Sequence, residues 1–112
     1  MHSDWSGSEP LQRVADILDA LRRLQAYTSG VTKEDFLRDE MRRDATIRAL
    51  EVLSEAARHL KIHAPEFEAR YPDVAFQRIA GAGDIYRHQY GFVDDEIVWN
   101  SVHGADLVAI RI

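Results

Sequence analysis

The residues whose types and spacing could do chemistry lie in one short stretch, GAGDIYRHQYGF at residues 81–92. Asp84 and His88 are four residues apart, so on a helix they share one face and can hydrogen-bond. A histidine held by a carboxylate can act as a general base or general acid, because its pKa can be placed near neutrality. The same spacing is also typical of a pair that only supports a helix, and spacing alone leaves that interpretation open.

The other histidines and the arginine doublets give weaker signals. His59 and His63 have the spacing of two metal ligands on a helix, but no third ligand lies at a motif distance and HExxH is missing. A solvated or helix-capping role is favoured for both, and also for His103, which stands alone. Acids flank the doublets Arg22–Arg23 and Arg42–Arg43, which favours a solvated face of mixed charge over RNA contacts. We expect neither a metal nor a cofactor.

Length and composition restrict the class of protein. The 112 residues suffice for a single domain with a modest core, in which residues 1–8 are expected to be a disordered tail. The absence of cysteine excludes disulfides and cysteine catalysis and fits a cytoplasmic protein, and we expect no signal peptide or membrane span. A net charge of −5 disfavours general binding to phosphate backbones, so RNA would need a local patch or a pocket shared between subunits.

Helical periodicity predicts the first element that must position the chemistry. Pro10 suits a first helical turn with Ser8 as N-cap, and Gly30 can end the helix in a left-handed conformation. Between them, apolar residues recur at steps of three and four. They are Leu11, Val14, Ile17, Leu18, Leu21, Leu24 and Ala26.

The rest of the chain is also predicted to be helical. Thr32 is expected to cap a helical region that runs to about residue 62, with a break and a second cap at Asp39 or Asp44. A short helical piece or a turn between two prolines, a helix that contains Gly81 and Gly83, and a last helix from residue 94 or 95 follow. Four to five helices with short connections predict an all-α, up-and-down bundle.

Three stretches of the sequence resemble the HepT-like proteins of the HEPN superfamily, which are small helical proteins encoded beside a minimal nucleotidyltransferase (MNT). The stretches are LEVLSEAARHL (50–60), VTKEDFLRDEMRRDATIRALE (31–51) and YPDVAFQRIAGAGDIYRHQYGFVDDEIVW (71–99). The resemblance implies a homodimer that forms through the motif-bearing helices. It also implies a toxin that cleaves RNA without a metal and pairs with an MNT-type nucleotidyltransferase antitoxin.

The resemblance assigns roles to residues of the family's Rx4–6H motif. His88 corresponds to the base or acid, Asp84 to the polar residue, and Tyr90 to the tyrosine that the partner modifies with AMP. Gly83 stands where the family has its arginine, and the substitutes are Arg87, adjacent to His88, or Arg78 further upstream.

Two hypotheses follow from this departure. The first is an active endoribonuclease. The second is a catalytically degenerate HEPN subunit that binds, and is modified by, a partner nucleotidyltransferase.

Overall fold

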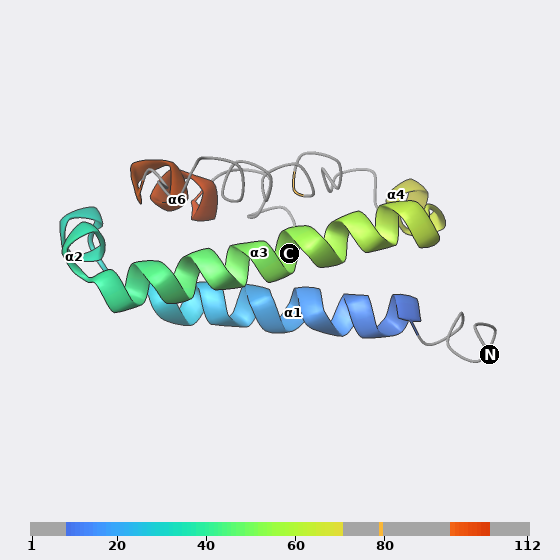
Figure 1. The fold of residues 1–112 in the computed structure, drawn as a ribbon, viewed down its shortest axis with the longest axis horizontal. Coiled ribbons are helices and arrows are strands. Elements are labelled where there is room, and N and C mark those ends of the chain that lie inside the picture. Colours follow the sequence, from blue (N-terminus) through green and yellow to red (C-terminus); the bar gives the residue numbers. More distant parts are fainter. Residues whose placement is uncertain (1–8, 71–78, 80–94, 104–112) are drawn as a thin grey trace.

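Two long helices, α1 and α3, lie side by side and run in opposite directions, with α2 at the end where they connect (Figure 1). The structure is a computed structural model that describes residues 9–70, 79 and 95–103. The helices within these residues are α1 (Glu9–Thr28), α2 (Lys33–Arg38), α3 (Glu40–His63), α4 (Glu66–Arg70) and α6 (Asp95–Val102). The described part of the chain holds no strand, and the predicted all-α class is confirmed. The tail expected at 1–8 lies outside the described residues.

The turn from α1 to α2 follows the predicted local signals. Gly30 has a φ of 72°, the left-handed conformation that glycine adopts without steric cost. The Thr32 hydroxyl then accepts the backbone N–H of Asp35 at 3.1 Å, which satisfies one of the free donors at the start of α2.

One residue separates α2 from α3. Asp39 has an extended backbone, with φ −104° and ψ 92°, and is both the last cap of α2 and the first cap of α3. Its carboxylate accepts the backbone N–H of Arg42 at 3.0 Å. Of the two breaks considered from the sequence, the structure selects Asp39 over Asp44.

The far end of α3 is also set by the sequence. Ala64 caps the helix by donating its N–H to the carbonyl of Leu60 at 2.8 Å. Pro65 follows, and α4 lies between it and the next proline, so of the helical piece or turn expected there the structure has the short helix.

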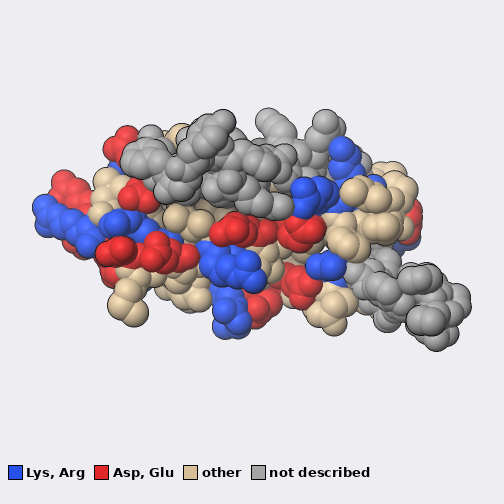
Figure 2. Space-filling view, in the orientation of Figure 1, with Lys and Arg blue, Asp and Glu red and all other residues tan. Residues whose placement is uncertain are grey.

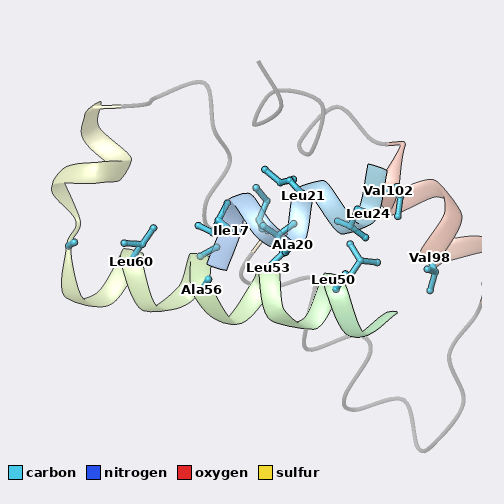
Figure 3. Packing of buried hydrophobic residues seen from close by; sticks show 14 of the residues in the cluster. Ile17, Ala20, Leu21, Leu24, Leu50, Leu53, Ala56, Leu60, Val98 and Val102 are labelled. Atoms are coloured by element: carbon cyan, nitrogen blue, oxygen red, sulfur yellow. The ribbon is translucent and has the colours of Figure 1, made fainter. Parts of the chain in front are cut away.

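The core lies between α1 and α3 and extends to α6 (Figure 3). Leu24 on α1 is fully buried and Leu53 on α3 is 1% exposed. Alanines interleave with these leucines, and such small side chains let helix backbones approach closely. The buried apolar residues are Ile17, Ala20, Leu21, Leu24, Phe36, Ala49, Leu50, Leu53, Ala56, Ala57, Leu60, Ala64, Ile79, Val98 and Val102.

Helix α6 packs beside α2 and the first half of α3 (Figure 1). Val98 and Val102, one helical turn apart, are fully buried. Trp99 packs on Phe36 of α2 with ring centroids 5.2 Å apart and planes tilted by 52°, a favourable edge-inclined geometry for aromatic pairs. Among the described residues, no helix combines the length and apolar character that crossing a bilayer demands.

Candidate active site

The four predicted site residues, Asp84, Arg87, His88 and Tyr90, lie outside the residues that the structure describes. The structure therefore leaves their mutual geometry untested. It does describe Ile79, which precedes them in the sequence and is buried at 4% exposure. After them comes α6, whose first residue lies seven positions beyond the histidine.

The first turn of α6 is held by two ion pairs. Arg43 of α3 pairs with Asp95, with Nε 2.9 Å from Oδ2, and these side chains are 20% and 35% exposed. Lys33 of α2 pairs with Glu96 at 3.3 Å, but its side chain is 45% exposed and that of Glu96 is 61% exposed. The Arg43 pair is less hydrated and is thus the stronger of the two tethers.

The expectation of a solvated face is wrong for Arg42–Arg43. Arg42 donates from Nη1 to the carbonyl of Tyr27 at 2.7 Å, and Arg43 donates to the carbonyl of Leu37. Both acceptors lie in the last turns of helices, where carbonyls lack partners within the helix. The two guanidinium groups donate hydrogen bonds to these carbonyls, so they join the start of α3 to the ends of α1 and α2.

The same expectation is confirmed for Arg22–Arg23. Both side chains pair with the exposed carboxylate of Asp19, at 2.6 and 2.8 Å. Hydrogen bonds from these two arginines lower the pKa of the Asp19 carboxyl below its usual range. Figure 2 shows the acidic and basic side chains of the described residues intermingled on the face that it views, so those residues form no continuous basic track for a phosphate backbone on that face.

Two adjoining hollows, of about 340 and 430 Å³, lie along the groove between α1 and α3. They share Arg48 and Val52 in their walls, and Tyr27 lines the larger one. Arginines and acids line them together, and no histidine is among the lining residues that the structure describes. The described walls of the groove thus lack the side chain best suited to proton transfer near neutral pH.

The described histidines do not assemble a metal centre. The rings of His59 and His63 lie 4.6 Å apart on α3. In the described ranges, no group of three or more His, Asp or Glu side chains could hold a metal ion. His103 contacts the last turn of α6, with Nδ1 2.8 Å from the Trp99 carbonyl, in the capping role that its position predicts.

Comparison with known proteins decides the family. A family model described as "Ribonuclease HepT-like" matches residues 17–111. The chain belongs to the HepT-like ribonuclease family. The matched region of this HepT-like chain includes every residue of the predicted site.

Curated relatives of the HepT-like chain carry ribonuclease names. "Putative RNase MJ0127" of Methanocaldococcus jannaschii is 33% identical over 87 residues, which is 78% of this chain and 69% of the relative. "Probable ribonuclease HepT" of Thermococcus cleftensis is 31% identical over 78% of this chain and 76% of its own length. "Putative RNase TTE0752" of Caldanaerobacter subterraneus is 30% identical over 83% and 80%. No solved structure gives a significant match.

Proposed function

We propose that this HepT-like protein is the toxin of a toxin–antitoxin pair and an endoribonuclease that uses His88 and needs no metal. Membership of a ribonuclease family over residues 17–111 carries this proposal, because that region contains the histidine of the family motif. The relatives' ribonuclease names support the same class of substrate.

The proposed reaction is an internal transfer at phosphorus. The 2′-hydroxyl oxygen of a ribose attacks the neighbouring phosphorus and loses its proton to a base, while the bond to the 5′-oxygen breaks and that oxygen gains a proton. The products are a 2′,3′-cyclic phosphate end and a 5′-hydroxyl end. His88 serves as base or acid, and a homodimer would supply two copies, one for each proton transfer.

The motif arginine is the part that this chain lacks. Positive charge at the phosphate stabilises the transition state, and removing a single donor of this kind costs about 3–4 kcal/mol in known enzymes. Arg42 and Arg43 are committed to helix-end carbonyls and carboxylates, so they are poor substitutes. Arg87, or Arg78, of either subunit remains the candidate for this role.

Cleavage of end-labelled RNA in the presence of EDTA tests the proposal. The wild-type protein should give products ending in a 2′,3′-cyclic phosphate, and His88→Ala should reduce the rate to background. Cleavage that survives the His88→Ala change would remove the histidine from the mechanism. Loss of all activity in EDTA, restored by a divalent cation, would contradict a metal-free reaction.

The second candidate is a degenerate subunit, and Gly83 is the observation that favours it. In this role the protein would bind an MNT-type nucleotidyltransferase and accept AMP on the hydroxyl of Tyr90. That transfer joins the tyrosine oxygen to the α-phosphorus of ATP and releases pyrophosphate.

Intact-mass measurement after co-expression with the neighbouring gene tests this alternative. The expected result is a complex and a mass increase of one AMP group, which Tyr90→Phe abolishes. A chain that forms no complex and gains no mass would contradict it.

A further inference from the structure

One face of α3 has the residue spacing of a helix–helix contact. Its residues recur at alternating steps of four and three, which places them on one stripe that can face a second helix. None of them is buried, and Met41 and Ile62 at the two ends are 84% and 64% exposed. We call this stripe the α3 seam. It consists of Met41, Ala45, Arg48, Val52, Glu55, His59 and Ile62.

The centre of the α3 seam borders the two hollows of the α1–α3 groove. Both hollows have Arg48 and Val52 in their walls. Arg48 is exposed and makes no ion pair or hydrogen bond within the described part of the chain. Glu55 pairs with Arg58 of the same helix, yet its side chain is 44% exposed. Because a carboxylate can accept several donors, Glu55 can bind a second cation.

The α3 seam is nearly symmetric about Val52. Arg48 lies four residues before Val52 and Glu55 lies three after it, while Met41 and Ile62 lie eleven before and ten after. A two-fold axis beside Val52 would place an antiparallel copy of α3 against the seam. Since a helix rises 1.5 Å per residue, Arg48 would then lie level with Glu55 of the copy to within about 1.5 Å. Met41 and Ile62 would match equally well.

The charges of the α3 seam favour one way of pairing it with a copy. In the antiparallel arrangement, Arg48 of each subunit faces Glu55 of the other, which gives two ion pairs related by the axis. In a parallel arrangement, arginine would face arginine and glutamate would face glutamate, and like charges repel. The small side chain of Ala45, opposite His59 of the copy, lets the helices approach closely.

We propose that the α3 seam is a self-association surface, on which a second copy of this chain packs antiparallel with Arg48–Glu55 pairs across a two-fold axis. The contact is separate from the one that the family resemblance assigns to the motif-bearing helices. It goes beyond the proposed function, because it requires no nuclease activity. With few apolar side chains and exposed charges, it is weak and forms at high protein concentration. Together, the two contacts would join two dimers into a tetramer.

Charge reversal in the full-length protein tests the pairing. Arg48→Glu and Glu55→Arg each set like charges against one another twice, so each should weaken association through the seam on the order of 100-fold. An equimolar mixture of the two variants should restore it, because every pair between unlike subunits is again arginine with glutamate. Arg38→Glu reverses an exposed arginine of α2 outside the seam and should change nothing. Sedimentation velocity over a range of concentrations measures association, and circular dichroism verifies the helical content of each variant.

A single introduced cysteine tests the geometry, because the chain has none of its own. Val52→Cys places a thiol of each copy beside the two-fold axis, where the two can reach the Cα separation of about 4.4–6.8 Å that a disulfide needs. In air-oxidised samples it should form a covalent dimer on the order of 10-fold faster than Leu18→Cys, although Leu18 on α1 is 61% exposed. Adding Arg48→Glu to Val52→Cys should remove that advantage.

Three results would overturn the inference. The first is association that both charge reversals leave unchanged, and the second is a mixture of the two variants that associates no better than either alone. The third is a Val52→Cys protein that cross-links no faster than Leu18→Cys. None of these results depends on RNA cleavage, so failure of this inference is distinct from failure of the proposed function.

Discussion

Asp39 shows how one residue can organise two helices, since its backbone N–H donates to the carbonyl of Phe36 at the end of α2 and its side chain caps α3. It accepts the backbone N–H of Arg42 at 3.0 Å and the Arg42 Nε at 3.2 Å. The backbone hydrogen bond is the main cause that lowers the pKa of the Asp39 carboxyl, and the charges of Arg42 and Arg43 add to it. Because the folded pKa is below the unfolded value of about 3.9, ionised Asp39 stabilises the folded state above that pH.

We expect Asp39→Ala to lower the melting temperature at pH 7 more than Asp39→Asn, since asparagine retains a capping oxygen. The stabilisation by the ionised carboxylate is lost as pH falls through the folded pKa. The difference in melting temperature between wild type and Asp39→Asn should therefore shrink below about pH 4. Thermal unfolding followed by circular dichroism between pH 7 and pH 2 measures both effects. A difference that stays constant over this range would contradict the pKa assignment.

At the scale of helices, the apolar pattern of α1 contains more residues than the core buries. Ile17, Leu21 and Leu24 are buried, as predicted, while Leu11 and Leu18 are 67% and 61% exposed. Leucines at three- and four-residue steps cover a wide arc of a helix, and α3 packs on only part of it. Periodicity alone cannot say which flank the partner helix covers.

The buried and exposed leucines of α1 give a matched pair for mutation. Leu24→Ala should lower the free energy of unfolding by about 2–5 kcal/mol, because it removes buried methyl groups and leaves a cavity. Leu18→Ala should change it by less than about 0.5 kcal/mol, since that side chain is mostly in water already. Urea unfolding measures both. Equal losses for the two variants would contradict the packing of α1 on α3.

Among the contacts where helices meet, those within a few residues could be predicted from the sequence and those between distant residues could not. The Thr32 cap and the left-handed Gly30 are local, and both are confirmed. The roles of Arg42 and Arg43 depend on carbonyls and a carboxylate supplied by other helices, up to 52 positions away in the case of Asp95. Flanking acids gave the wrong interpretation there, because local charge patterns carry no information on such distant partners.

The residues of the predicted site were identified from the sequence by family resemblance and not by local structural signals. Resemblance to a family identified His88 and Tyr90 by motif, and the family itself is confirmed. Their roles stay predictions, because the structure does not describe these residues. The ion pairs that hold the first turn of α6, in contrast, could not be predicted from the sequence and were found only in the structure.

At the scale of the whole molecule, the proposed chemistry calls for two subunits. We expect a homodimer with twice the 12.8 kDa mass of the chain, held by the motif-bearing helices, since two copies of His88 then share one site. Light scattering after size-exclusion chromatography measures the mass, and His88→Ala should give the same value. A single-chain mass at all concentrations would contradict the shared site.

The central claim is that His88 cleaves RNA, and restoring the missing arginine tests it most directly. RNA-cleavage rates should be measured side by side for wild type, Gly83→Arg, His88→Ala and the double variant. If the added guanidinium reaches the phosphate, Gly83→Arg should raise the rate by on the order of 100- to 1,000-fold. The double variant should fall to background. A double variant that cleaves as fast as Gly83→Arg would contradict the account.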